Sequence, residues 1–590
     1  MYYIGIDFGH GETTVSRVPG YNREVVSQIA LKNTNHSADK KIISAIYQYE
    51  GYWAFMGGIG DPDLRKGFKG RVSKMSERDR ESMREFAKLV FNKILEQNKD
   101  ELDYKSIEDK NFVLGIACPS GWEKEDPNAQ NEYLEFFRNE CGLPVDLCIK
   151  ESDAAFFSKF DRYRENVDEN VFVIDLGSST IDFTAYSNGK CVQSWGNTEL
   201  GAHIIEDLLL ADIKRIEKNK KSIEKLEEYR ASIGYGSCEE GLSLWARIQK
   251  EYFFTNERNI IINLPFGEVV SKLPKDKRLE TCIMYQIDRD EFNHMINSYM
   301  VSLYQELNNA KERLDQHGIL PTKVLLSGGA CRMPFIQKYT RDIFGCRVDI
   351  DPQPECVVSN GIALYAQAQD ESWKDVEDSL NKVNFEDLYI EADRNATHEV
   401  AKKLFPKVFK EIEKQEEINC SEIYNKIVDF FLGLNSYNVE YVKSFNSSLN
   451  SYLNDKIYNY IYSALEKKFN IKIEKSDVNI IVSAQILSYP REYFLPEHNG
   501  HFIIYDLLKK ATGPHIFSPF DELKNRDKNE KYHIKRLCEE KLCVGDPFGI
   551  GYNNEHLKEA TNSIKEQCLL EAKKIFISKQ LFQTTFKCHE

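Results

Sequence analysis

Two similar stretches decide the fold: IGIDFGHGETTVS at residues 4–16 and VIDLGSSTIDFT at residues 173–184. Each is an apolar strand that ends in Asp-x-Gly, passes through a tight polar turn and resumes as a Thr-rich strand. The second copy continues to Asn188-Gly189, a pair suited to a type I′ turn, and returns through Cys191-Val192. After the first copy, residues 42–55 show another hairpin pattern that turns at Glu50-Gly51. The repeat predicts two related lobes.

Helices alternate with short buried strands outside these hairpins. We expect helices at 78–98, 128–140 and 152–164 and strands at 112–117 and 145–149 in the first lobe. The second lobe adds helices near 202–253, at 290–315, 333–343 and 355–369, a strand pair near 259–287 and a strand at 323–327. This alternation predicts an α/β architecture with mixed sheets covered on both faces.

The pattern changes after about Asp370. Long amphipathic stretches at 397–417, 421–433, 437–469 and 555–578 surround two strand-like pieces at 478–483 and 501–505. The sequence therefore predicts a first domain over residues 1–370, with lobes at about 1–168 and 169–370, and a mostly helical domain over 371–590. We find no chemical motif in the second domain.

The composition excludes several classes of protein. A 590-residue chain with 42% hydrophobic and 29% charged residues is typical of a folded protein of several domains. The formal charge of −15 argues against a general nucleic-acid binder, and the basic run at 214–225 alternates with glutamates as on a solvated helix face. No apolar run approaches the roughly 20 residues of a membrane span, and the N-terminus lacks a signal-peptide pattern. We expect a cytoplasmic protein that binds neither nucleic acid nor membrane.

The chemistry is predicted to lie where the repeated strands end. An Asp followed by a Gly-containing turn puts a carboxylate and free backbone N–H groups at one sheet edge, where they can hold a phosphate. Two such turns could grip a triphosphate from both sides while Asp7 and Asp175 orient Mg²⁺, mainly through its waters. A third element, VLLSGGACRMP at 324–334, offers Gly328 and Gly329 for close approach of a flat ring and Arg332 to stack on it.

The order and spacing of these pieces resemble the DnaK-type heat-shock chaperones and their superfamily with actin and the sugar kinases. The resemblance covers about residues 1–370. Its pieces are the two phosphate turns, VLGIACP at 113–119, KESDAA at 150–155, ELGA at 199–202, GGACRMP at 328–334 and VVSNGIALYA at 357–366. It implies two duplicated ribonuclease-H-like lobes around a nucleotide cleft, the actin-like ATPase fold.

The resemblance also implies roles for individual residues. Asp7 and Asp175 would hold the Mg²⁺ shell, and Glu151 would help place the metal or the attacking water. Thr180 and Asp182 would lie near the γ-phosphate and a monovalent cation such as K⁺. Lys69, in preference to Lys66, matches the catalytic lysine. Gly201, Gly328 and Gly329 would border the nucleoside, with Arg332 against the adenine. The remaining contacts to ATP or ADP would come from Gly9, His10, Gly11, Thr13, Gly177, Ser178, Ser179 and Lys250.

Three features depart from the chaperone pattern. The first phosphate turn is one residue longer, as in actin-like plasmid-segregation proteins, and has His10 where a hydroxyl residue is usual. Near residues 245–255, Lys250 is kept but Arg247, Glu251 and Phe254 stand where the chaperones usually have an acid, a base and a serine. The chain after 370 shows no β-sandwich pattern of a peptide-binding domain.

The leading hypothesis is a chaperone-like switch that binds ATP, hydrolyses it slowly and acts on a protein partner through the helical C-terminal region. One alternative is an actin-like filament former, which the first phosphate turn favours and the roughly 150 residues between Asp175 and Gly328 disfavour. A small-molecule kinase and an inactive binding module are further alternatives. The sequence leaves the oligomeric state open.

Overall fold

A computed structural model of the chain describes two compact units, residues 1–371 and a second unit within 372–584. The residues that it describes are 1–20, 26–29, 31, 41–56, 58, 60–107, 109–122, 126–163, 170–187, 190–256, 260–264, 283–393, 395–396, 399, 438–469, 473–481 and 554–579. The turn at Asn188-Gly189 lies outside them.

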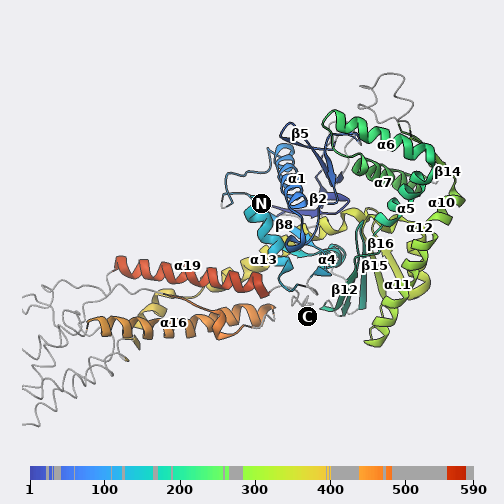
Figure 1. The fold of residues 1–590 in the computed structure, drawn as a ribbon. Helices are drawn as coiled ribbons and strands as arrows, with labels where there is room; N and C mark the ends of the chain where they lie inside the picture. The colour runs from blue at the N-terminus through green and yellow to red at the C-terminus, as the bar shows by residue number, and fades with distance from the viewer. Residues whose placement is uncertain are drawn as a thin grey trace, which may run out of the picture. The chain divides into compact units, whose positions relative to one another are not determined.

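The first main sheet of unit 1 grows from the first copy of the repeat (Figure 1). Strand β1 (Tyr2–Phe8) pairs antiparallel with β2 (Glu12–Pro19) and parallel with β8 (Phe112–Cys118). Beyond β8 lies the parallel strand β9 (Leu147–Lys150), and the short strands β3 (Ser27–Gln28) and β4 (Lys41–Ile43) pair with β2.

The second main sheet repeats this plan. Strand β10 (Asn170–Leu176) pairs antiparallel with β11 (Ile181–Ser187) and parallel with β15 (Lys323–Ser327). Its edges are β12 (Lys190–Asn197), antiparallel to β11, and β16 (Arg347–Ile350), parallel to β15. Opposite Asp7 in the register stands Thr14, and opposite Asp175 stands Asp182. The repeat seen in the sequence is therefore a repeat of strand order and register.

Two smaller sheets complete unit 1. Strand β5 (Ala45–Tyr49) lies between β6 (Tyr52–Phe55) and β7 (Leu64–Lys66), and β13 (Ile260–Leu264) pairs with β14 (Ile283–Ile287). Between β5 and β6 the chain turns at Glu50 and Gly51, with φ angles of 50° and 84°. Positive φ at both central residues is what a type I′ hairpin turn requires, so the turn predicted there is confirmed.

The helices of unit 1 follow the predicted order. The long region near 202–253 divides into three helices, and the helix predicted at 290–315 breaks at Ile296, where α10 ends. The end of the helix predicted at 128–140 is a π-helical turn, Phe136–Glu140. The helices are α1 (Glu77–Gln97), α3 (Ala129–Glu135), α4 (Glu151–Tyr163), α5 (His203–Arg215), α6 (Glu217–Ser232), α7 (Glu239–Asn256), α10 (Arg289–Met295), α11 (Asn297–Gln316), α12 (Pro334–Phe344) and α13 (Val357–Asn381).

The two sheets and their helices form layers because alternate residues of a strand face opposite sides. On β1, Ile4, Ile6 and Phe8 pack with α1 and the end of α3, and on β10, Phe172 and Ile174 pack with α5, α7, α11 and α12. The other faces of both sheets share a core with α4 and α13, which lie between them (Figure 1). Asp7 and Asp175 occupy strand positions on this central side, so the two carboxylates are directed to the same region.

The second unit contains two long described helices, α16 (Asn438–Phe469) and α19 (Asn554–Lys579), which pack against each other. The strand predicted at 478–483 is wrong for its described part, 478–481. The side chain of Asn454 donates to the carbonyl of Ile480 and accepts from its N–H at 2.9 and 2.7 Å, so helix side chains replace a partner strand. The helices predicted at 397–417 and 421–433 and the strand at 501–505 lie outside the described residues, apart from residue 399.

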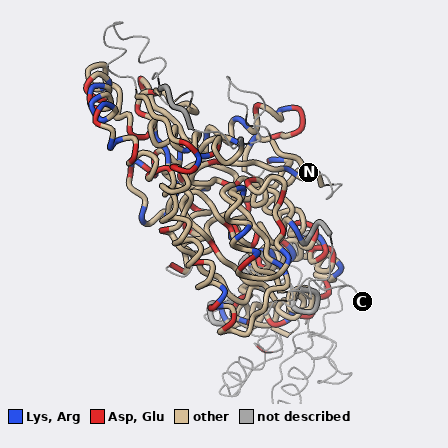
Figure 2. The backbone as a smooth tube through the Cα atoms, turned by 90° about the vertical axis from the view of Figure 1, so that its right-hand side faces the viewer, with Lys and Arg blue, Asp and Glu red and all other residues tan. Residues whose placement is uncertain are grey.

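Charged residues of both signs alternate along the described backbone (Figure 2). The basic run at 214–225 covers the end of α5 and the first part of α6, where lysines alternate with glutamates. Within the part of the chain that the structure describes, every helix is too short or too polar to cross a membrane.

Candidate nucleotide site

A cavity of about 560 Å³ opens where the two phosphate-turn hairpins meet in unit 1. This volume is within the range of small-molecule and cofactor sites in proteins. Of the residues predicted to form the nucleotide site, those that line it are Asp7, Gly9, His10, Gly11, Lys69, Glu151, Asp175, Gly177, Ser178, Ser179, Thr180, Lys250, Gly328, Gly329 and Arg332. The fold therefore gathers around one cavity residues that are up to 325 positions apart (from 7 to 332).

Burial favours the protonated form of three acids that lie at this cavity or directly behind its wall. Burial raises the pKa of Asp7 to about 7, with Lys69 opposing the shift and Glu151 adding to it. Burial and then Glu151 raise the pKa of Asp182 to about 7, and burial raises the pKa of Asp175 well above its ordinary value. Buried acids with raised pKa values favour a bound cation, because the cation supplies positive charge in place of the bound proton.

Lys69 and Glu151 form a buried ion pair at the cavity wall. The lysine Nζ donates to the glutamate Oε1 at 2.5 Å, and the two side chains are only 7% and 10% exposed. Glu151, Asp7 and Tyr133 raise the pKa of Lys69 against the effect of burial, so the lysine is charged at neutral pH. Glu151 is the first residue of α4, directly after β9, and this places its carboxylate at the carboxyl edge of the first sheet.

The glycines of the turns allow backbone to approach backbone. Gly328 has a φ of +87°, and a Cβ built on it would lie 2.2 Å from the carbonyl oxygen of Leu176. A Cβ on Gly11 would lie 2.0 Å from an Nη atom of Arg247 and 3.1 Å from Cβ of Ser178. The two phosphate turns and helix α7 thus meet at Gly11, where a side chain would displace the end of Arg247.

Three of the predicted site residues lie behind the described part of the cavity wall. Thr13 is buried and its hydroxyl contacts that of Ser44 at 3.0 Å. Asp182 accepts hydrogen bonds from the hydroxyl of Thr180 and the N–H of Gly121, at 2.9 and 3.0 Å. Gly201 packs under the second turn, where a Cβ would lie 2.3 Å from the carbonyl oxygen of Ser178. These residues support the turns from behind.

His10 lies on the cavity wall as a neutral side chain. Burial, and then the positive charge of Lys66, lower its pKa to about 3. The imidazole therefore offers a single N–H donor at neutral pH and adds no positive charge to the first phosphate turn.

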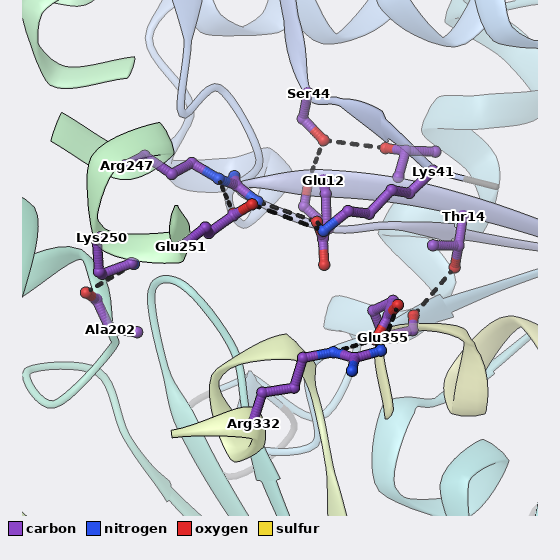
Figure 3. Close-up of polar contacts among 12 residues, drawn as sticks. Glu12, Thr14, Lys41, Ser44, Ala202, Arg247, Lys250, Glu251, Arg332 and Glu355 are labelled. Atoms are coloured by element: carbon purple, nitrogen blue, oxygen red, sulfur yellow. Dashed lines mark hydrogen bonds and ion pairs between the residues drawn. The ribbon is translucent and has the colours of Figure 1, made fainter. Parts of the chain in front are cut away.

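A group of four charged residues on the wall was not foreseen in the sequence (Figure 3). Glu12 and Lys41 come from the first sheet and Arg247 and Glu251 from α7. The Oε2 atom of Glu12 contacts Lys41 Nζ at 2.8 Å and Arg247 Nη2 at 3.1 Å, and Arg247 Nε donates to Glu251 at 2.8 Å. In the sequence, only the unusual residues Arg247 and Glu251 indicated a difference at this place. Nothing in the sequence indicated that Lys41 belongs to the site.

Two other cations of the wall are already paired. Lys250 donates to Glu206 Oε1 at 2.7 Å and to the carbonyl of Ala202 at 3.1 Å. Arg332 makes a two-pronged contact with Glu355, with both carboxylate oxygens within 3.1 Å of its nitrogens (Figure 3). This pairing holds the guanidinium plane of Arg332 in one orientation at the cavity edge.

Comparison with known proteins agrees with this geometry. The family model described as Hsp70 protein matches residues 141–415. This part of the chain is similar to the Hsp70 family. The match includes Glu151, the second phosphate turn, α7 and the Gly328 loop, and it extends beyond the boundary of unit 1 at residue 371.

The chain is also similar to curated proteins named as DnaK chaperones. The chain is 25% identical over 337 residues to chaperone protein dnaK of Thalassiosira pseudonana, covering 48% of this chain and 51% of that protein. It is 25% identical over 256 residues to chaperone protein dnaK1 of Synechococcus elongatus, and 23% identical over 240 residues to chaperone protein DnaK of Thermoplasma volcanium. These two matches each cover 40% of this chain and 35% and 37% of the relatives. The chain thus spans about a third to a half of the length of these curated relatives.

Proposed function

We propose that this chain is an Hsp70-like, Mg²⁺-dependent ATPase that works as a slow conformational switch on a protein partner in the cytoplasm. Unit 1 would have the actin-like ATPase fold, with two ribonuclease-H-like lobes that close on ATP or ADP. The observation that carries the proposal is the meeting of two equivalent Asp-x-Gly turns at one cavity, which the Lys69–Glu151 pair also lines.

The acids of the cavity suit a magnesium ion. Asp7 and Asp175 are the residues that would hold it, through its waters, and their raised pKa values indicate that an added cation would be stabilised there. Bound Mg²⁺ would supply positive charge to the phosphate oxygens. Thr180 and Asp182, which are hydrogen-bonded to each other, would hold K⁺ near the γ-phosphate.

The protein groups would mainly position and stabilise charge, as is general for phosphoryl transfer. The N–H groups of the two turns would hold the phosphate chain, and Lys69 would stabilise negative charge that develops on the γ-phosphate. Glu151, fixed by Lys69, would orient the attacking water. Arg332 would present its flat guanidinium to the base, and residues 371–590 would contact the protein partner.

The test is Mg²⁺-dependent ATP hydrolysis together with calorimetric binding of ATP and ADP. Asp175→Asn and Glu151→Gln should each lower hydrolysis by about 100-fold or more. Asp175→Asn should also weaken the Mg²⁺ dependence of binding. The matched control is Asp342→Asn, an exposed aspartate on α12, which should behave as wild type. Failure of the wild-type chain to bind any nucleotide would refute the proposal, and ATP-dependent pelleting would favour the filament alternative.

A further inference from the structure

Glu12 is an acidic side chain inside a cavity that we propose binds phosphates. It is the first residue of β2 and follows Gly11 of the first phosphate turn, and it lines the cavity with a side chain that is 16% exposed. A carboxylate beside a polyphosphate is unfavourable unless it serves another part of the ligand. Its contacts indicate which part.

The two oxygens of Glu12 have different surroundings. Oε2 contacts both Lys41 and Arg247, at 2.8 and 3.1 Å, so the carboxylate is held in place. Oε1 has no hydrogen-bond donor among the described residues. It lies close to Gly329, where a Cβ would be 2.9 Å from it. Figure 3 shows this oxygen directed away from Lys41 and Arg247, toward the side where Arg332 and Glu355 lie.

A carboxylate that pairs with two cations accepts hydrogen bonds, so the group that meets Oε1 must be a donor. Phosphate oxygens are not donors and are repelled. Glu12 adjoins the phosphate turn on one side and Gly329 on the other. In a nucleotide, the donors nearest to the phosphate chain are the hydroxyl groups of the ribose, since the base is attached beyond the sugar.

We infer that Glu12 selects ribonucleotides by accepting a hydrogen bond from a ribose hydroxyl through Oε1. This inference rests on the proposed nucleotide binding and adds the residue that recognises the sugar. Lys41 and Arg247 act as positioning residues, because they hold Oε2 and so direct Oε1 into the cavity. Gly329 is required beside Oε1, because a side chain there would displace it.

The experiment compares Mg²⁺-dependent binding of ATP, 2′-deoxy-ATP and 3′-deoxy-ATP by calorimetry. Wild type should bind one of the two deoxynucleotides about 10- to 100-fold more weakly than ATP, the loss of a hydrogen bond to a charged group. In Glu12→Ala this preference should shrink to about 3-fold or less. In Glu12→Gln, which keeps the shape and a neutral acceptor, it should shrink by about 3- to 10-fold.

Glu251→Gln is the matched control, because it removes the other acid that contacts Arg247 and Lys41 and leaves Oε1 of Glu12 in place. It should keep the full preference for the ribose. Equal binding of all three nucleotides by wild type, or a preference that survives in both Glu12 variants, would overturn the inference while nucleotide binding itself stands. Absence of binding of any of the three to wild type would instead remove the proposed function.

Discussion

Replacing Lys69 by methionine separates the stability of the site from its chemistry. Removing one partner of a buried ion pair costs about 3–5 kcal/mol, because it leaves the other charge uncompensated. The remaining Glu151 carboxylate can avoid this cost by taking up a proton. For a carboxyl group with an ordinary pKa near 4.3, protonation at pH 7 costs about 3.7 kcal/mol. We therefore expect Lys69→Met to lose about 3–4 kcal/mol of unfolding free energy at pH 7.

The pH dependence of this loss follows from the same reasoning. A carboxyl group that is protonated in the folded variant and ionised in the unfolded chain destabilises the fold more as pH rises, by about 1.4 kcal/mol per unit. The difference between wild type and Lys69→Met should therefore fall to about 1 kcal/mol at pH 5. Urea unfolding of the full chain at both pH values, without nucleotide, measures it.

The double variant Lys69→Met/Glu151→Gln is the control, since both charges are then gone and the side-chain volumes are nearly kept. It should regain most of the lost stability while ATP hydrolysis stays about 100-fold or more below wild type. A loss below about 1 kcal/mol at pH 7, a loss equal at both pH values, or a double variant no more stable than the single one would each refute the reasoning.

Three further predictions concern the protonation of buried acids, the packing of glycines and the contact with the adenine base. Because burial sets the pKa of Asp7 and Asp182 at about 7, above the ordinary carboxyl value, the nucleotide-free protein should lose stability as pH rises from 4 through 7. Mg²⁺–ATP binding at pH 7 should release protons, seen as a buffer-dependent heat; equal heats in all buffers would contradict this. Gly361→Ala should cost about 3 kcal/mol, because its Cβ would lie 1.7 Å from the carbonyl oxygen of Ala154, whereas Gly58→Ala, in open space, should change stability by less than about 1 kcal/mol in thermal unfolding. Arg332→Lys should weaken ATP binding about 3- to 10-fold in calorimetry, as should Arg332→Met, because lysine lacks the planar face; full affinity in either would exclude stacking.

The framework of unit 1 was predictable because its signals are local. The Asp-x-Gly hairpins, the Glu50-Gly51 turn and the alternation of strands and helices each depend on a few neighbouring residues, and the structure has them in the predicted order. The cavity residues at strand ends followed from the same rule, since the carboxyl ends of neighbouring parallel strands meet at one edge.

The sequence could not predict which charged side chains pair with each other across the cavity. Glu12 and Arg247 are 235 positions apart, and nothing near either residue indicates the other. The strand predicted at 478–483 is wrong in its described part for a similar reason, because backbone groups of Ile480 and Ile481 are bonded to Asn454 and Gln567 of other helices. Likewise, Gly201 and Thr13 belong to the segments predicted to form the site, but which side of each segment faces the cavity depends on tertiary packing.

The two main sheets share their register, but one pair of equivalent strand positions holds different residues. Opposite Asp7 stands Thr14, whose hydroxyl is used up in binding Ser359 of α13, and opposite Asp175 stands Asp182, an ionisable group close to the cavity. In the first sheet the residue at this position thus binds helix α13, and in the second sheet it is an ionisable side chain. The two sheets share an outline but are not interchangeable at this position, because only the second has an acid there.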